Sequence, residues 1–242
     1  MDRMIYLSMS GAKATMQRQD TLANNLANVS TNGFREELTA FRAVPVLGEG
    51  ASTRVYAIES TPGYSAQPGP VNATGRALDV AMTANTWLAV QGSDGTEAYT
   101  RGGALEVNPE GLLVTATGGL QVQGDGGPIT VPTNAELLVA TDGTVTAKVG
   151  TGRPQAIGRL KLVTPETPLS RGDDGLFRAT QGELSADTTA RLQPGALEGS
   201  NVSPVGAMVA MIAAARQFEQ QMKMMQTAQE AEQGANKLLA SG

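Results

Sequence analysis

The chain has 242 residues, of which 40% are hydrophobic and 17% charged, and its net charge is −5. This length and composition are typical of a folded chain that buries a sizeable core. Cysteine and histidine are both absent. Their absence excludes disulfides, zinc–thiolate sites and the nucleophilic enzymes that depend on a thiolate or an imidazole. Negative charge without a basic cluster argues against a nucleic-acid partner. We therefore predict a protein that is not an enzyme and that binds no cofactor, metal or nucleic acid.

Proline and glycine divide the chain into three parts. All 12 prolines lie between Pro45 and Pro204, and only five of the 29 glycines lie outside that interval. An internal proline costs a helix about 3 kcal/mol, so residues 1–44 and 205–242 are free to form continuous helices. No apolar run approaches a membrane span, and the first residues lack a signal-peptide pattern. We expect no membrane span and no cleaved secretory signal.

The first segment carries a helical stripe. Its members alternate at spacings of four and three, which predicts a helix over about residues 3–28 with one apolar seam. Polar and small members make this helix marginal by itself. The stripe consists of Ile5, Met9, Ala12, Met16, Gln19, Ala23 and Leu26.

The last segment repeats the same spacing and predicts a second long amphipathic helix. Ser203 and Pro204 are typical of an N-cap and a first helical position. Several methionines widen the apolar face, which favours contact with more than one neighbour; a helical hairpin within one chain is an equally good interpretation of the stripe alone. The stripe begins with Met208, Ile212, Ala215, Phe218, Met222 and Met225.

The middle of the chain predicts an antiparallel, all-β domain of the sandwich or open-barrel kind. Asp94-Gly95 and Asp142-Gly143 predict hairpin turns. Residues 45–72 are rich in proline and glycine and predict an extended linker or arm. Strands are expected at residues 78–82, 87–91, 104–107, 112–115, 120–122, 129–131, 136–140, 144–148, 158–163 and 176–178.

Two glycine-rich segments invite a ligand-site interpretation. Residues 171–175, Arg-Gly-Asp-Asp-Gly, lack the alternating ligands of a calcium loop. Residues 124–128 lack the lysine and the following helix of a phosphate loop. Both favour solvated turns.

Four asparagines cluster where the first helix is expected to end, just before Gly33. Asparagine side chains compete for backbone hydrogen bonds, and glycine permits a positive φ. Physical chemistry alone favours a capped turn at this point.

The segment Ala-Asn-Asn-Leu-Ala-Asn-Val-Ser-Thr-Asn-Gly-Phe-Arg, residues 23–35, resembles the signature of the flagellar axial family, which comprises rod, hook and hook-associated proteins. Residues 197–205, Leu-Glu-Gly-Ser-Asn-Val-Ser-Pro-Val, resemble the family's entry into its last helix. Residues 99–103, Tyr-Thr-Arg-Gly-Gly, are similar to part of its β domain. The opening residues 1–6, residues 216–225, and Asn-Thr-Trp-Leu at residues 85–88 favour a proximal rod subunit over the distal rod or hook.

This resemblance implies a structural subunit of the proximal rod of the bacterial flagellar basal body. Its terminal helices would pair as a coiled-coil-like inner domain and polymerise into the periplasmic drive shaft that carries torque to the hook. Its partners would be itself, other rod proteins and the flagellar type III export apparatus. The expected division is residues 1–35, an arm at 36–75, a β domain at 76–195, and a helix at 196–242.

Two sets of site residues follow. The family motif implies a joint at the end of the first helix, formed by Asn24, Asn25, Leu26, Ala27, Asn28, Thr31, Gly33 and Phe34. We expect Ile5, Met9, Met16 and Leu26 to pack against Met208, Ile212, Phe218, Met222 and Met225, with other faces meeting neighbouring subunits. An adhesin with a coiled-coil stalk should show a signal peptide, and an enzyme using Asp173 and Asp174 should show an acid–base pair; neither feature is visible.

Overall fold

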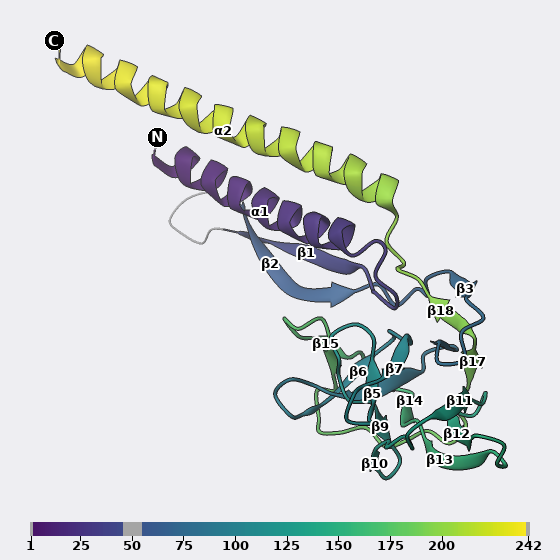
Figure 1. Ribbon diagram of the computed structural model, residues 1–242. Helices are drawn as coiled ribbons and strands as arrows, with labels where there is room; N and C mark the ends of the chain where they lie inside the picture. The colour runs from purple at the N-terminus through teal and green to yellow at the C-terminus, as the bar shows by residue number, and fades with distance from the viewer. Residues whose placement is uncertain (1, 46–54, 241–242) are drawn as a thin grey trace. The chain divides into compact units, whose positions relative to one another are not determined.

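The computed structural model describes residues 2–45 and 55–240, which fall into two compact units. Unit 1 combines Met1–Val29, Glu36–Ser65 and Val202–Gly242; unit 2 combines Ser30–Arg35 with Ala66–Asn201. The chain has a helix near each end and antiparallel strands between them (Figure 1). The predicted α+β class is therefore confirmed.

Unit 1 contains both predicted helices. Helix α1 (Asp2–Ala27) begins and ends one residue before the predicted bounds. Helix α2 (Pro204–Ala240) begins at the predicted proline. The Ser203 hydroxyl accepts a hydrogen bond from the Gly206 N–H at 3.3 Å, so the expected N-cap is present.

Residues that we expected to form a linker instead form most of a long hairpin. Strand β1 (Glu37–Pro45) pairs with β2 (Val55–Tyr64) in antiparallel register, from Glu37↔Tyr64 to Pro45↔Val55. Pro62 falls where the register shifts, and such irregularities are where a strand tolerates proline. Proline content therefore misled the prediction for these residues. The predicted linker residues 46–54 lie outside the described part of the chain.

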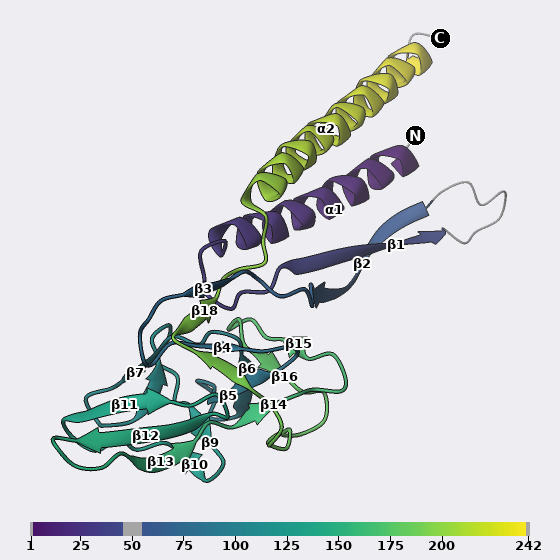
Figure 2. The same cartoon turned by 90° about the vertical axis from the view of Figure 1, so that its right-hand side faces the viewer.

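Helix α1 lies between α2 and the β1–β2 hairpin, and it runs antiparallel to α2 (Figures 1 and 2). Most of the stability of a helix in a protein comes from tertiary packing rather than from helix propensity. Helix α1 therefore depends on contacts along two faces, one toward α2 and one toward the hairpin.

Unit 2 is built from short antiparallel strands. The largest sheet has the order β14-β5-β6-β16-β15, and a three-stranded sheet has the order β11-β12-β13. The remaining pairs are β17-β4, β18-β3, β7-β8 and β10-β9. The strands are β3 (Val71–Ala73), β4 (Val80–Met82), β5 (Trp87–Gln91), β6 (Glu97–Thr100), β7 (Leu105–Val107), β8 (Leu113–Thr115), β9 (Gln123–Gly124), β10 (Gly127–Pro128), β11 (Ala135–Val139), β12 (Thr144–Val149), β13 (Gln155–Arg159), β14 (Leu162–Val163), β15 (Ser170–Arg171), β16 (Phe177–Arg178), β17 (Leu192–Pro194) and β18 (Ala196–Glu198).

Both predicted hairpin turns are confirmed, with φ of +79° at Gly95 and +86° at Gly143. The expected strands at residues 120–122 and 129–131 are present only as isolated bridges, including Val90↔Val122. Strand β6 was not predicted, because its sequence, Glu-Ala-Tyr-Thr, is short and half polar.

The core of unit 2 forms around β5. Trp87, the only tryptophan in the sequence, is buried, and its ring centroid lies 4.6 Å from that of Phe177. Tryptophan fluorescence therefore reports on unit 2 alone. The hydrophobic cluster is formed by Val80, Met82, Leu88, Val90, Ala98, Leu105, Leu113, Val122, Ile129, Val131, Leu137, Val139, Val145, Ala147, Leu160, Leu162, Leu176, Ala190 and Leu192.

Candidate functional site

The end of α1 is attached to the hairpin through one buried amide. The Asn25 Nδ2 donates to the Glu37 carbonyl and its Oδ1 accepts from the Glu37 N–H, both at 2.9 Å. One side chain thus satisfies both backbone groups of the first residue of β1. Asparagine is one of the few side chains that carry a donor and an acceptor in this geometry.

Two further asparagines complete the last turn of α1. The Asn28 Nδ2 donates to the Asn24 carbonyl at 3.0 Å and to its Oδ1 at 2.8 Å. The Asn24 Nδ2 donates to the Glu37 Oε2 at 3.2 Å. Side-chain bonds of this kind satisfy groups that a helix end leaves open. Of the other motif residues in this turn, Leu26 is partly buried and Ala27 is exposed.

Gly33 has the positive φ that its position predicts, +73°. Its N–H donates to the Glu198 carbonyl at 2.8 Å, and a Cβ at this position would overlap the backbone carbonyl of Arg101. The Thr31 carbonyl accepts from the Phe34 N–H at 3.2 Å. The buried Phe34 ring lies 4.6 Å from the Arg171 guanidinium. The positive φ of Gly33 and the closeness of the Arg101 carbonyl together require glycine at position 33.

A buried carboxylate holds unit 2 together beside Gly33. Glu198 accepts from Arg35 at 2.8 Å, from the Arg101 Nε at 2.6 Å and from the Gly69 N–H at 3.0 Å. The three charged side chains are at most 3% exposed. Arg101 also donates to the carbonyls of Met82, Ala84 and Thr86. Arg35 and Arg101 share one carboxylate, and these three carbonyl oxygens supply the further hydrogen bonds that a buried guanidinium requires.

Further hydrogen bonds join three of the four segments that meet at this cluster. The Asn201 Nδ2 donates to the Gln67 carbonyl at 2.8 Å, and Arg35 donates to that same carbonyl. The Asn201 N–H donates to the Phe34 carbonyl at 3.3 Å. The three segments are therefore tied side by side within unit 2.

Sequence reasoning missed the cluster, although it quoted the motif around each member. Arg35 ends Gly-Phe-Arg, Arg101 lies in Tyr-Thr-Arg-Gly-Gly, and Glu198 lies in Leu-Glu-Gly-Ser-Asn. One charged residue within each of three otherwise uncharged motifs is a signal that could have suggested an ion pair. Which charges meet is a tertiary property.

The helices of unit 1 approach each other through small residues. The buried residues of α1 include Ser8, Ala12 and Thr15, and those of α2 include Ala207 and Ala214. A Cβ on Gly11 would lie only 3.0 Å from the side chain of Gln221. Small side chains permit this close approach.

Burial on α1 follows the predicted stripe at Ala12 and departs from it on either side. Met9 and Met16 are 53% and 57% exposed, whereas Ser8 and Thr15 are buried. Met208, Ile212 and Met222 are exposed as well, while Ile5, Leu26, Phe218 and Met225 are partly buried. The expectation that the exposed residues pack within one chain is corrected. Their apolar side chains form a surface.

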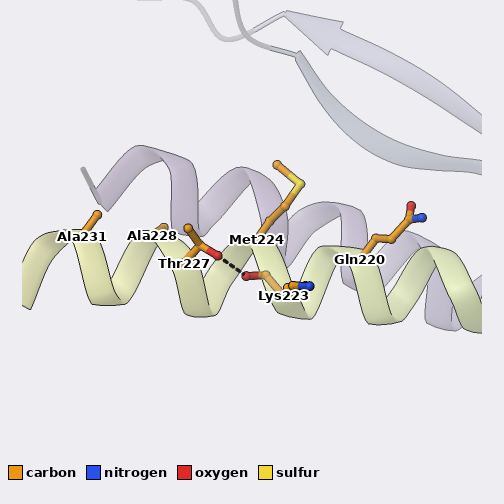
Figure 3. A pocket seen from close by; sticks show the side chains of 6 residues that line it. All are labelled: Gln220, Lys223, Met224, Thr227, Ala228 and Ala231. Carbon is orange, nitrogen blue, oxygen red and sulfur yellow. Dashed lines mark hydrogen bonds between the residues drawn. The ribbon is translucent and has the colours of Figure 1, made fainter.

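A pocket of about 630 Å³ lies along the second half of α2 (Figure 3). The Thr227 Oγ1 donates to the Lys223 carbonyl at 3.0 Å at its edge. Its described lining residues are Gln220, Lys223, Met224, Thr227, Ala228 and Ala231.

The two glycine-rich segments are turns. Asp174 accepts from Arg178 and from the Leu176 N–H, and these bonds lower the pKa of its carboxyl. Residues 124–127 form the β9–β10 hairpin. Among the described residues there is no group of three or more potential metal ligands, and no described helix is long and apolar enough to cross a membrane.

Comparison with known proteins identifies the family. Three family models match: the flagella basal body rod protein over residues 5–35, the flagellar hook protein FlgE/F/G D1 domain over residues 81–147, and the flagellar basal body rod FlgEFG protein C-terminal over residues 193–238. The chain is 48% identical to the flagellar basal-body rod protein FlgF of Salmonella typhimurium and 47% identical to that of Escherichia coli K12, in each case over 99% of both chains. The chain belongs to the FlgF family of flagellar basal-body rod proteins.

The relation to FlgG is weaker. Identity to the flagellar basal-body rod protein FlgG of Bacillus subtilis is 30%, over 94% of this chain and 96% of the relative. FlgF membership confirms the family resemblance and the prediction that the chain is a structural protein rather than an enzyme. The matched FlgE/F/G and rod models together include Arg35, Arg101 and Glu198.

Proposed function

We propose that this FlgF-family chain is a structural subunit of the proximal rod that polymerises through its terminal helices. The observation that carries the proposal is the apolar surface of those helices, where Met9, Met16, Met208, Ile212 and Met222 are exposed in the single chain. Apolar side chains grouped on a helix surface mark an interaction site. Assembly with other rod subunits covers them.

The inner domain that we propose is the antiparallel pair of α1 and α2 in a coiled-coil-like arrangement. Its support is the alternation of buried positions at spacings of four and three, at residues 8, 12 and 15 of α1. Unit 2 acts as the central β domain, in a sandwich or open-barrel arrangement. The division proposed from the sequence, at residues 35, 75 and 195, places residues 36–75 in a separate arm, whereas Glu36–Ser65 belongs to unit 1 and Ala66–Asn201 to unit 2.

The motif at the end of α1 acts as a joint. Asn25 connects the last turn to β1, and Gly33 allows the chain to turn into unit 2. Asn24, Asn28, Thr31 and Phe34 hold the bonds around it. The joint sets the direction in which the chain leaves the helix.

Export precedes assembly in this proposal. The chain leaves the cell through the flagellar type III apparatus without signal cleavage and is added to the rod in the periplasm. Long helices that are marginal alone gain order when they pack against neighbours, so folding and polymerisation are coupled.

Replacement of Met222 by aspartate tests the proposal. Met222→Asp places a charge on the exposed face of α2, and we expect loss of motility and loss of the chain from isolated basal bodies, because burying an unpaired carboxylate in a subunit contact is costly. Trp87 fluorescence should give an unchanged unfolding curve for unit 2. The matched control is Leu138→Asp, which alters an exposed apolar residue of unit 2. Normal motility of Met222→Asp would refute assembly through this face.

A further inference from the structure

Unit 1 carries two different apolar stripes that have no partner among the described residues of the chain. The first lies on α1 and contains Tyr6, Met9 and Met16, each more than half exposed. The second lies on the first turns of α2 and contains Val205, Met208, Val209 and Ile212, also each more than half exposed. Positions three, four and seven residues apart share one face of a helix. The α2 stripe is therefore a continuous apolar surface, and the α1 stripe is interrupted by Lys13.

The two stripes match in spacing and in charge. Met9 and Met16 are seven residues apart, as are Val205 and Ile212, so each pair spans the same length of helix. Residues 204–215 of α2 carry no charge, and the only charged residue between Met9 and Met16 is Lys13. The stem of a lysine lies on apolar surface while its ammonium group stays in water. No like charges oppose each other when the stripes meet.

We infer that the α1 stripe of one copy docks antiparallel on the α2 stripe of a second copy of this chain, with Met9 opposite Ile212 and Met16 opposite Val205. This inference rests on the proposed rod function. Because the two surfaces differ, the contact is head-to-tail, and a pair of copies leaves one free stripe at each end. Contacts of this type form open helical filaments when the rotation does not close a ring.

The inferred contact has a register that differs from the helix pairing within one chain. Within one chain Gly11 faces Gln221, which puts Met9 level with about residue 223 of its own α2. Opposite Ile212 of a second copy, Met9 lies roughly eleven residues nearer the start of α2. At 1.5 Å per residue the second copy is displaced by about 16 Å along the helix axis.

The alternative is an unshifted contact, which places Met9 and Met16 level with Lys223 and Arg216 and beside the pocket in Figure 3. Two methionines would then lie against charged side chains. This register gains one exposed ion pair, between Lys13 and Glu219, and exposed pairs contribute little. The shifted register covers apolar surface with apolar surface.

Cysteine cross-linking tests the inference, because the natural sequence contains no cysteine. Met9→Cys/Ile212→Cys reports the shifted register and Met9→Cys/Met224→Cys the unshifted one. A second shifted pair, Met16→Cys/Val205→Cys, covers the case in which the first pair does not assemble. Basal bodies isolated from cells that carry each variant are oxidised and analysed on non-reducing gels. A disulfide forms only where two Cβ atoms lie roughly 3.5–4.5 Å apart.

We expect dimers and larger species of this chain from either shifted pair, at about ten times the yield of the single-cysteine variants, because a fixed contact raises the effective thiol concentration. Dimers from Met9→Cys/Met224→Cys, with none from either shifted pair, would overturn the shifted register. A cross-link only to another rod protein, or none from either shifted pair, would overturn the contact between copies. Motility and the presence of the chain in the basal bodies report the rod function separately.

Discussion

At the scale of single residues, Gly33 combines two constraints that its neighbours in the sequence do not reveal. Its φ of +73° disfavours any side chain, and a Cβ would also overlap the Arg101 carbonyl. Gly75 has the same φ of +73° but open space around it. Comparing substitutions at Gly33 and Gly75 therefore separates the cost of the left-handed backbone from the cost of steric overlap.

We predict that Gly75→Ala destabilises unit 2 by about 1–2 kcal/mol, the ordinary cost of a left-handed residue, and that Gly33→Ala costs clearly more. Denaturant unfolding followed by Trp87 fluorescence measures both. Equal losses in the two variants would show that the backbone around Arg101 relaxes at no cost.

Asn25 satisfies both backbone groups of Glu37, and its side chain is buried. Asn25→Ala leaves a donor and an acceptor without partners, at about 1–3 kcal/mol for each buried group. We predict faster hydrogen exchange in the peptide that contains the start of β1. Asn24→Ala is the control, since Asn24 is exposed and bonds only the Glu37 side chain across this joint. Unchanged exchange in Asn25→Ala would mean that water replaces the amide.

At the scale of elements, the Glu198 cluster connects β18 to the segments around Arg35, Gly69 and Arg101. Glu198→Gln keeps the shape of the side chain but leaves two buried guanidinium groups without a counter-charge. Removing one partner of a buried ion pair costs about 3–5 kcal/mol, and we predict a loss of this size in the stability of unit 2.

Trp87 fluorescence in denaturant measures that loss, and Glu110→Gln, which changes an exposed carboxylate in a turn, is the matched control. A loss no larger than that of the control would mean that the backbone carbonyls around Arg101 compensate both guanidinium groups by themselves.

At the scale of the whole molecule, the acid stability of unit 2 depends on the carboxylates of its turns. Hydrogen bonds from Thr96 and Thr144 lower the pKa values of Asp94 and Asp142, and Arg178 does the same for Asp174. Hydrogen bonds from Thr189 and Thr164 lower the pKa of Asp187 to about 2.

A lowered folded-state pKa stabilises a protein above the unfolded pKa, near 4, and this stabilisation is lost as pH falls through the folded value. We predict that the Trp87 unfolding midpoint falls between about pH 4 and pH 2, and that Asp187→Asn removes part of this dependence. If the midpoint depended on pH equally steeply in wild type and in Asp187→Asn, the dependence would be assigned to other groups.

The features that could be predicted from the sequence are local ones. The helix bounds, the Ser203–Pro204 helix start and the turns at Gly95 and Gly143 follow from rules that involve a few neighbouring residues. The family signature at residues 23–35 also lies within one segment, and the comparisons confirmed the family. By itself the sequence determined the helical ends, the β-rich middle and the rod family.

The tertiary structure decided which distant residues meet. Nothing near Glu198 in the chain indicates that Arg35 and Arg101 share its carboxylate, and the proline-rich arm showed no sign that β1 pairs with β2. On α1 the small residues Ser8, Ala12 and Thr15 are buried while Met9 and Met16 are exposed, and a count of apolar residues does not show where small side chains permit close approach. Pairing, burial and register depend on which surfaces come together in space, and local propensity carries no information about that choice.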